Sequence, residues 1–246
     1  MQKICIVIPC FNEEHRLNLE LFENFFKQKS FCNVCFVNDG STDDTQRILE
    51  KLKLKIGNNC SVINMKQNKG KAEAVRTGVL NNIAKDFDYI GFFDADLSTP
   101  LKQIDVFIEH INSSLELDIL MGTRFSHLGA TIKRSRFRHY FGRIFSTIAS
   151  LILKLNVYDT QCGAKLYSKK CYTKIFSNTF KSKWLFDIEL LFRYMEVFGR
   201  ESAKKLIREI PLTSWIEKKN SKLKLNDFIR IPADLFIVWF FYRNKN

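Results

Sequence analysis

The chain has 246 residues, of which 46% are hydrophobic, enough to bury the core of one large α/β domain or two small ones. Its seven cysteines are odd in number and scattered, which argues against a disulfide framework and for a reducing, cytoplasmic setting. Cys32 and Cys35 have CxxC spacing, but no second pair follows and they lie in an apolar run, so we expect no metal or redox role for them.

The net charge of +13 is unevenly distributed along the chain. Residues 1–123 carry 14 Lys/Arg against 17 Asp/Glu, whereas residues 124–246 carry 25 against 9. The second half is therefore expected to face something anionic: a nucleic acid, a membrane surface or a phosphorylated substrate.

The first apolar run covers residues 3–9 and closes at Pro9. It is too short for a signal peptide or a membrane span, and it is typical of a strand buried on both faces of a parallel sheet. Asn12 and Glu13 follow, in a loop before a helix expected over residues 17–29. They lie where ligands usually bind an open α/β sheet, although acidic residues near the positive end of a helix are an equal alternative.

The second strand is expected over residues 31–37 and is followed closely by Asp39. A carboxylate there can accept the N–H and O–H donors of a nucleotide base or ribose. Ser41 or Thr42 can cap the next helix, which we expect to run to about residue 53.

A short third strand, residues 61–64, precedes a helix that we expect to begin near residue 68 and to run to about residue 84. Lys71 lies beside Gly70 at the start of this helix, a position that suits an anion. The GxxxxGK[ST] spacing of a Walker A loop is absent, so this signal is weak by itself.

The fourth strand, residues 89–93, delivers Asp94 and Asp96 at its carboxyl end. Side chains at positions i and i+2 of an extended chain point the same way, so both carboxylates can reach one target. Two adjacent carboxylates with a hard divalent cation between them would form a metal–diphosphate site. The alternative is a solvated turn, in which aspartate is common.

Four β–α alternations, each with polar residues where the strand ends, predict a doubly wound α/β sheet. In order and spacing these segments resemble family 2 glycosyltransferases with the GT-A fold, and most closely the dolichyl-phosphate β-glucosyltransferase branch of the polyprenyl-phosphate enzymes. Ala72 and Ala164 stand where that family commonly has Gly and Phe. The matching segments are residues 4–13, 37–43, 68–78, 93–100, 121–124, 133–136, 159–167, 184–191 and 209–215.

The resemblance implies a single GT-A domain over residues 1–246, an open mixed sheet flanked by helices. Residues 1–123 would form the half that binds nucleotide sugar and metal, and residues 124–246 the basic half that binds the acceptor. The implied reaction is inverting transfer of a hexose, dependent on Mg²⁺ or Mn²⁺, to a polyprenyl or dolichyl phosphate. Glucose from UDP-glucose is the first expectation and mannose from GDP-mannose the second; a glycan or glycolipid acceptor is a further alternative.

The resemblance also implies roles for individual residues. Asp159 is the first candidate to orient or deprotonate the acceptor and Asp187 the second, with Gln161 and Lys165 helping to shape that pocket. The candidates for nucleotide-sugar binding are Pro9, Asn12, Glu13, Asp39, Lys71 and Asp94, and those for the metal are Asp94 and Asp96. The candidates for the acceptor phosphate are Arg124, Arg134, Arg136 and Arg138, because a guanidinium matches phosphate oxygens.

Two apolar segments, residues 141–153 and 235–242, are too short or too interrupted to span a bilayer. Basic residues at their margins favour helices lying on an anionic membrane, and packing in the core is the alternative. We therefore expect a cytoplasmic protein, or one peripheral on the cytoplasmic face. A nucleic-acid-binding protein is disfavoured because acidic strand ends would repel phosphates without a metal. A membrane-binding protein without catalysis is disfavoured by the retained acids and Arg124.

Overall fold

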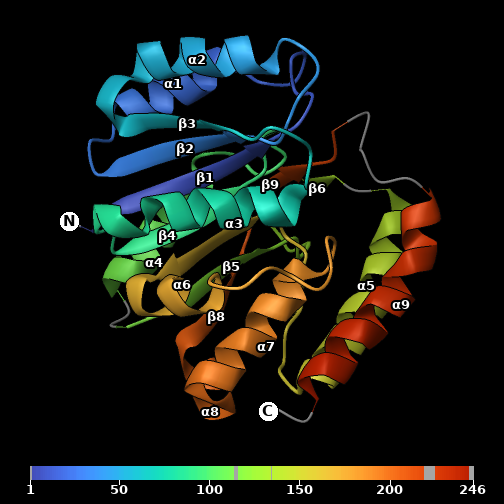
Figure 1. Cartoon of the computed structure of the whole chain (residues 1–246). Coiled ribbons are helices and arrows are strands. Elements are labelled where there is room, and N and C mark those ends of the chain that lie inside the picture. Colours follow the sequence, from blue (N-terminus) through green and yellow to red (C-terminus); the bar gives the residue numbers. More distant parts are fainter. Residues whose placement is uncertain (1, 114–115, 134, 219–224, 244–246) are drawn as a thin grey trace.

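A computed structural model describes residues 2–113, 116–133, 135–218 and 225–243, with the side chains of 136–139 and 225–230 left out. Within this part of the chain the core is a seven-stranded sheet with the order β3-β2-β1-β4-β7-β5-β8 (Figure 1). The strands in that order are β3 (Cys60–Asn64), β2 (Cys32–Asn38), β1 (Ile4–Cys10), β4 (Tyr89–Phe93), β7 (Ala164–Ser168), β5 (Ile119–Thr123) and β8 (Ile207–Pro211).

Strands β3, β2, β1 and β4 pair with one another in parallel, and so do β5 and β8. Strand β7 runs antiparallel between β4 and β5, which makes the sheet mixed. The predicted α/β fold with an open mixed sheet is confirmed. Because β7 runs backwards, its first residue pairs with the last residue of β4, Ala164 with Phe93. The segment before β7 is thereby brought to the edge where β4 ends.

Helices cover both faces of the sheet (Figure 1). One apolar cluster packs α1 (Leu19–Lys27), α2 (Thr45–Ile56) and α4 (Gln103–Ser113) on one face. The cluster on the other face contains α3 (Lys71–Asn82), α5 (Arg136–Leu153), α6 (Lys169–Ile175), α7 (Phe186–Phe198), α8 (Arg200–Leu206) and α9 (Leu225–Tyr242).

Burial on both faces explains why the sequence of β1 is continuously apolar. Ile6 and Ile8 belong to one cluster, and Cys5 and Val7 belong to the other, so successive side chains are buried on opposite faces. The two cysteines of the CxxC spacing are separated in the same way, since Cys32 and Cys35 lie in different clusters, and all seven thiols are free and buried.

The predicted cap of α2 is wrong. The helix begins at Thr45 with Asp44 as the N-cap residue, and no side chain caps it. Ser41 and Thr42 instead bond to Asn12 in the neighbouring loop. A tertiary contact between two loops has thus taken the hydroxyls that local spacing assigned to the helix.

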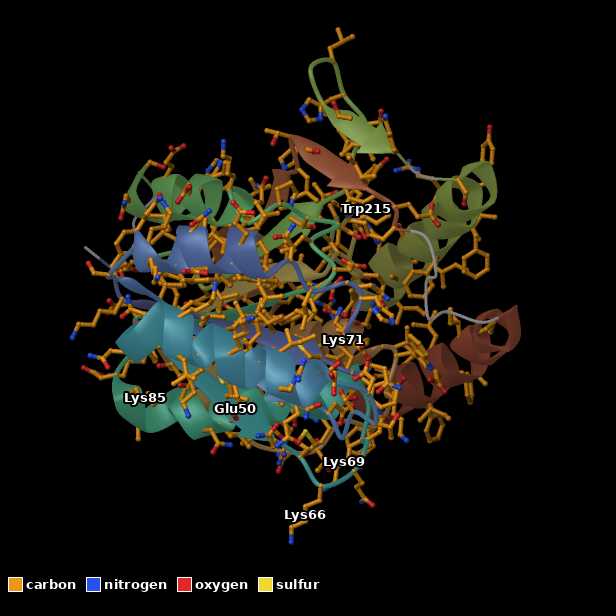
Figure 2. All side chains as sticks on the ribbon, turned by 90° about the horizontal axis from the view of Figure 1, so that it is seen from above. Glu50, Lys66, Lys69, Lys71, Lys85 and Trp215 are labelled. Carbon is orange, nitrogen blue, oxygen red and sulfur yellow. The ribbon has the colours of Figure 1, made fainter. Side chains whose placement is uncertain are left out.

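Helices α5 and α9 lie at the end of the molecule remote from α1 and α2, in both views of the chain (Figures 1 and 2). Each helix has a buried side, which includes Ala149 and Leu153 in α5, and Leu235 and Val238 in α9. Each also has large apolar side chains that are exposed: Tyr140, Ile144, Ile148 and Leu151 in α5, and Phe236, Ile237, Phe240 and Phe241 in α9. No helix in the described ranges is long and apolar enough to cross a membrane.

A two-stranded parallel ribbon of β6 (Thr131–Lys133) and β9 (Ser214–Ile216) lies beside the end of the sheet. The amide of Ile216 donates to the carbonyl of Ser98, 3.2 Å away, just after Asp96. This ribbon brings Trp215 from the second half of the chain to the carboxyl end of the sheet.

Candidate active site

The loops that follow β1 and β2 are fastened to each other at the edge of the sheet. The backbone N–H of Asn12 donates to Oγ of Ser41 over 3.0 Å, and its Oδ1 accepts the N–H of Thr42 over 2.9 Å. The N–H of Glu13 donates to Oγ1 of Thr45 over 2.7 Å. Asn12 has a φ of 49°, a left-handed conformation that Asn tolerates better than most residues. Asn12 and Glu13, both predicted donor-site residues, thus also build the rim of the site.

Asp39 fixes the next loop along the edge. One carboxylate oxygen accepts the N–H of Lys69 and the other that of Gly70, each over 2.8 Å. Asp39 is buried, and this burial raises the pKa of its carboxyl group above the ordinary value, although the two N–H donors oppose the shift. The predicted nucleotide-binding carboxylate therefore also holds the turn from which α3 begins.

Asp94 meets the first residue of α3. Nζ of Lys71 lies 2.5 Å from Oδ1 of Asp94 and 5.4 Å from the centre of the Phe92 ring. Burial lowers the pKa of Lys71, but the carboxylates of Asp94 and Asp187 outweigh it and raise that pKa overall. From above, Lys71 lies within the outline of the molecule, whereas Lys66 projects from its rim (Figure 2). Lys71 therefore lies next to Asp94, another residue predicted to bind the nucleotide sugar.

Asp96 meets a cation from the first loop. Nη2 of Arg16 lies 2.8 Å from Oδ2 of Asp96, and Nε of Arg16 lies 3.2 Å from Oε2 of Glu13. The N–H of Ser98 donates to the other oxygen of Asp96 over 2.9 Å. Arg16 thus joins the carboxylates of two predicted site residues that are more than 80 positions apart in the chain.

The segment that precedes β7 packs directly on Asp94. The N–H of Asp94 donates to the carbonyl of Gly163 over 3.1 Å, and a Cβ on Gly163 would overlap the Asp94 carboxylate. Only glycine allows this approach. The backbone of Cys162 is held from the interior of the protein, because Nζ of the buried Lys165 donates to its carbonyl oxygen over 2.6 Å.

Asp187, the second predicted catalytic residue, lies in the first turn of α7 and is buried. Its Oδ1 is 2.5 Å from Nζ of Lys165. Burial raises the pKa of Asp187, and the neighbouring ammonium groups of Lys165 and Lys71 oppose that shift. Two Lys–Asp pairs therefore lie one behind the other: Lys71 with Asp94 towards the edge, and Lys165 with Asp187 in the interior.

Asp159, the first predicted catalytic residue, forms a two-pronged ion pair with Arg124. Nε and Nη2 of Arg124 lie 2.6 and 2.7 Å from the two carboxylate oxygens. Glu209 in β8 accepts the N–H groups of Tyr158 and Asp159 over 2.8 and 2.7 Å. The guanidinium also lies 5.3 Å from the centre of the Trp215 ring. Arg124 is therefore held in one orientation from several sides.

The structure tests the predicted acceptor residues only at Arg124. Arg134 lies outside the described residues, and so do the side chains of Arg136 and Arg138 at the start of α5. The predicted site residues with described side chains gather at the carboxyl ends of β1, β2, β4 and β5 and in the segments beside them.

Two residues of this edge were not predicted as site residues, Arg16 and Glu209. Arg16 follows Glu13 by three positions, and Glu209 lies in one of the segments that carry the family resemblance. A basic residue that close to a strand-end acid could have been noticed. Its pairing with Asp96 could not, because that contact depends on the order of the strands.

The comparisons with known proteins agree on the class. The profile of the family described as glycosyl transferase family 2 matches residues 5–176. The dolichyl-phosphate beta-glucosyltransferase of Saccharomyces cerevisiae is 33% identical over 257 residues, which cover 96% of this chain and 73% of the yeast protein. The protein of that name from Drosophila melanogaster is 30% identical over 256 residues, covering 98% and 75% of the two chains.

Among solved structures, glucosyl-3-phosphoglycerate synthase from Mycobacterium tuberculosis, in complex with Mn²⁺, UDP and glucosyl-3-phosphoglycerate, superimposes with a TM-score of 0.70. The superposition covers 97% of this chain and 80% of that one at 17% sequence identity, so it shows the fold alone. Together with the family match and the relatives, it establishes that this chain belongs to glycosyl transferase family 2, as a hexosyltransferase with the GT-A fold.

Proposed function

We propose that this chain transfers glucose from UDP-glucose to dolichyl phosphate or a related polyprenyl phosphate, with inversion at the anomeric carbon. The relatives that cover nearly the whole chain are named for glucosyl transfer to that acceptor. The observation that carries the proposal is the position of Asp94. It touches Lys71 from the first half of the chain and Gly163 from the second, so donor and acceptor groups would meet there.

The residues present fit a hard divalent cation. Asp94 and Asp96 each contact a cationic side chain, Lys71 and Arg16, so both carboxylates lie where positive charge is favoured. No group of three or more His, Cys, Asp and Glu side chains in the described ranges could hold a metal. Two carboxylates with the remaining positions left to phosphate and water is how Mg²⁺ is usually bound. Asp94 and Asp96 would hold Mg²⁺ or Mn²⁺, which when bound acts as a Lewis acid on the leaving diphosphate.

In the proposed reaction an oxygen of the acceptor phosphate forms a bond to the anomeric carbon of glucose. The bond from that carbon to the β-phosphate oxygen breaks, and UDP leaves with the electron pair. Lys71 stands beside Asp94 with its charge available to the departing diphosphate. Because a phosphate monoester is already ionised at neutral pH, the demand for a strong base is small. Asp159 would then act mainly by orienting Arg124 towards the acceptor phosphate.

The same proposal places the protein on the cytoplasmic face of a membrane through α5 and α9. Their exposed apolar side chains include Ile144, Leu151, Phe236 and Phe240. Arg143 and Arg243 stand among them, and the second half of the chain is strongly basic. Apolar helices with basic margins bind anionic bilayer surfaces. Flotation with vesicles containing anionic lipid should carry the protein, and Phe236→Ser with Phe240→Ser should reduce it; equal flotation of the variant would contradict this placement.

The activity is tested by incubating the protein with a polyprenyl phosphate, Mg²⁺ or Mn²⁺, and each of UDP-glucose, UDP-galactose and GDP-mannose. We expect a lipid-linked hexose from UDP-glucose, identified by its mass. Asp96→Ala should abolish product, whereas Arg47→Ala, at an exposed position on α2, should not. A product from GDP-mannose alone would replace glucose by mannose, and no product from any donor would refute the proposal.

A further inference from the structure

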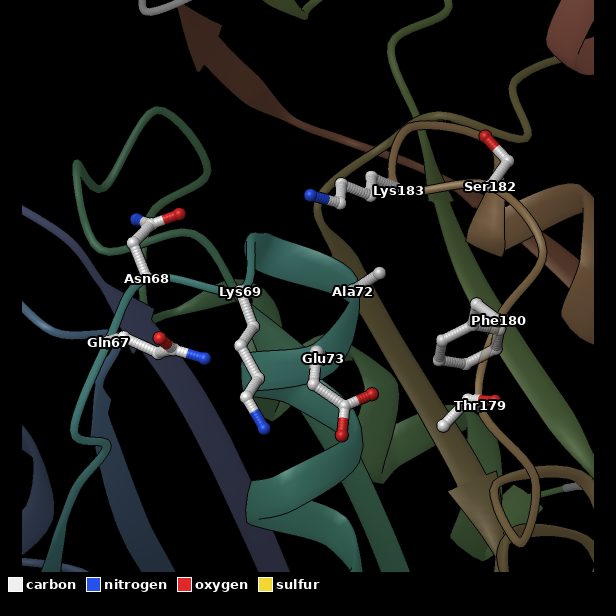
Figure 3. A pocket seen from close by; sticks show the side chains of 9 residues that line it. All are labelled: Gln67, Asn68, Lys69, Ala72, Glu73, Thr179, Phe180, Ser182 and Lys183. Carbon is white, nitrogen blue, oxygen red and sulfur yellow. The ribbon is translucent and has the colours of Figure 1, made fainter.

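The loop between α6 and α7, residues 176–185, lies against the start of α3 and closes one side of the site. Between them is a pocket of about 420 Å³, lined on one wall by Asn68 and Ala72 and on the other by Phe180 and Lys183. Figure 3 shows the Lys183 side chain extending from its wall across the mouth of the pocket, on the side where Asn68 lies. None of the predicted site residues lies in this loop.

Lys183 lies beside the turn at Gly70 that Asp39, a predicted nucleotide-binding residue, holds in place. Its Cδ lies 3.8 Å from the position that a Cβ on Gly70 would occupy. Its positive charge acts on Asp39, lowering the pKa that burial raises. Both carboxylate oxygens of Asp39 are already engaged by backbone N–H groups. Lys183 is exposed and, within the described part of the chain, has no ion-pair partner.

The backbone around Lys183 is held in place from α9. Oγ of the buried Ser182 donates to Oδ2 of Asp234 over 2.6 Å. The same oxygen accepts the N–H groups of Trp184 and Leu185 over 3.2 and 3.0 Å. The residues on both sides of Lys183 are therefore fixed by one hydroxyl, which is itself oriented by a carboxylate on another helix.

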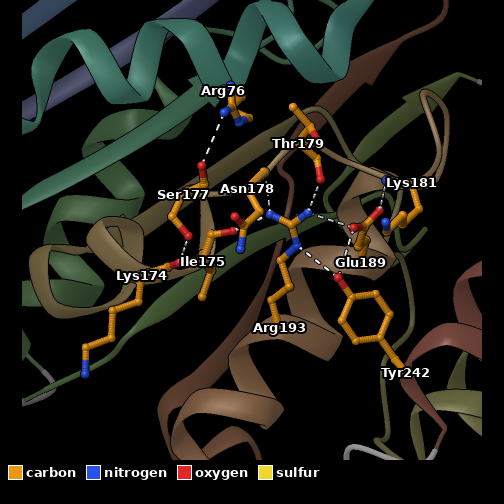
Figure 4. A network of polar contacts seen from close by, with 10 residues as sticks. All are labelled: Arg76, Lys174, Ile175, Ser177, Asn178, Thr179, Lys181, Glu189, Arg193 and Tyr242. Atoms are coloured by element: carbon orange, nitrogen blue, oxygen red, sulfur yellow. Dashed lines mark hydrogen bonds and ion pairs between the residues drawn. The ribbon is translucent and has the colours of Figure 1, made fainter.

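The earlier part of the loop is bound just as firmly (Figure 4). The buried guanidinium of Arg193 donates to the carbonyl oxygens of Asn178 and Thr179 over 2.7 and 2.6 Å. Glu189 accepts the N–H of Lys181 over 2.8 Å, and the hydroxyl of Tyr242 donates to Glu189 over 3.0 Å. A loop anchored this way presents the ammonium group of Lys183 at a defined place.

We propose that Lys183 is a donor-binding residue, whose ammonium group binds a phosphate of the nucleotide sugar, and that the Ser182–Asp234 hydrogen bond positions it. This rests on the proposed function, which supplies a nucleoside diphosphate beside Asp39 and Gly70. An ammonium group has three donors and no acceptor, so its partner must offer acceptor oxygens. Asp39, the carboxylate on which its charge acts, already accepts two backbone N–H groups, whereas a phosphate has both the charge and the free oxygens.

The test is the affinity of UDP, measured by calorimetry in the presence of Mn²⁺. Lys183→Ala should weaken UDP roughly tenfold or more, as expected for the loss of a charge-assisted hydrogen bond, and Lys183→Arg should recover part of the loss. Uridine, which lacks phosphate, should bind the variant and the unchanged protein equally. Lys181→Ala is the matched control, because Nζ of Lys181 lies 4.5 Å from the centre of the Phe241 ring, against α9.

Asp234→Ala tests the positioning role without removing the ammonium group. It should weaken UDP less than Lys183→Ala does, and combining the two should add nothing to Lys183→Ala alone. Equal UDP affinity of Lys183→Ala and the unchanged protein would overturn the inference and leave the proposed function standing. If the unchanged protein bound neither UDP nor GDP with Mn²⁺, the proposed function itself would fail.

Discussion

Gly163 and Asp94 form one structural unit, although 69 positions separate them in the chain. The carbonyl of Gly163 accepts the N–H of Asp94, and the Asp94 carboxylate fills the space where a Cβ on Gly163 would lie. The end of β4 and the segment before β7 therefore cannot move independently. The geometry of the predicted metal ligand is set partly from the second half of the chain.

Replacing Gly163 by Ala should displace the Asp94 carboxylate and reduce kcat/KM by about 100-fold or more, since a misplacement of about 1 Å can cost that much. Gly199→Ala is the control. Gly199 has a φ of 83° but open space around it, so the change should strain the backbone and leave turnover nearly intact. Equal kcat/KM values for Gly163→Ala and the unchanged protein would contradict this reading of the contact.

Arg16→Gln should strengthen Mn²⁺ binding to the protein without donor. The guanidinium of Arg16 forms an ion pair with the Asp96 carboxylate, and a metal that binds Asp96 must displace this guanidinium. Partly exposed ion pairs of this kind contribute up to about 1 kcal/mol, so the gain should be no more than about fivefold. Mn²⁺ titration followed by electron paramagnetic resonance measures it, with Asp96→Asn as the variant that should weaken binding. Weaker binding in Arg16→Gln would show that Arg16 supports the metal site instead.

Arg124→Met should destabilise the protein by about 3 kcal/mol, because it removes the guanidinium that makes the two-pronged ion pair with Asp159 in a site little exposed to water. Combining it with Asp159→Leu should recover much of that stability, since an apolar pair can replace a buried ion pair. Urea denaturation of the three proteins measures both effects. The double variant should still be inactive with the lipid phosphate; activity in it would remove Arg124 and Asp159 from the acceptor site.

Asp39 should make folding stability depend on pH. Burial raises its pKa in the folded state, so the folded protein holds this proton more tightly than the unfolded chain does. Stability must then fall as pH rises from 3.8, the ordinary pKa of an aspartate, through the raised pKa of the folded state. Asp39→Asn lacks this titration, so urea denaturation should show the unchanged protein losing stability relative to the variant over that range. A constant difference between the two proteins would contradict the raised pKa.

The cysteines should be unreactive while the protein is folded. All seven thiols are free and buried, and burial raises the pKa of Cys32 and Cys60 from 9.0 to about 12. The reactive thiolate is therefore rare at neutral pH. A chromogenic disulfide reagent should react slowly until denaturant is added, and then with all seven. Rapid reaction of even one thiol in the folded protein would show that its site opens.

The sequence allowed the prediction of the strands and of which residues lie at their ends. Runs such as residues 3–9 are apolar throughout because both faces are buried, and the polar residues after them must lie at an edge. The ion pairs between these residues could not be predicted in this way. Lys71 with Asp94 and Arg16 with Asp96 depend on the strand order, and Lys165 with Asp187 depends on β7 running antiparallel. The cap predicted at Ser41 failed for the same reason, a partner distant in sequence.

The placement of β7 between β4 and β5 also bears on the synthesis of the chain. When β5 has left the ribosome, both it and β4 still lack β7, the strand that lies between them, because residues 124–163 must still be added before β7 begins. At about 5–20 residues per second this delay lasts several seconds, during which two apolar strand edges are open to wrong partners. The nascent chain should therefore bind a chaperone most strongly in this interval, and release it once residues 164–168 have emerged.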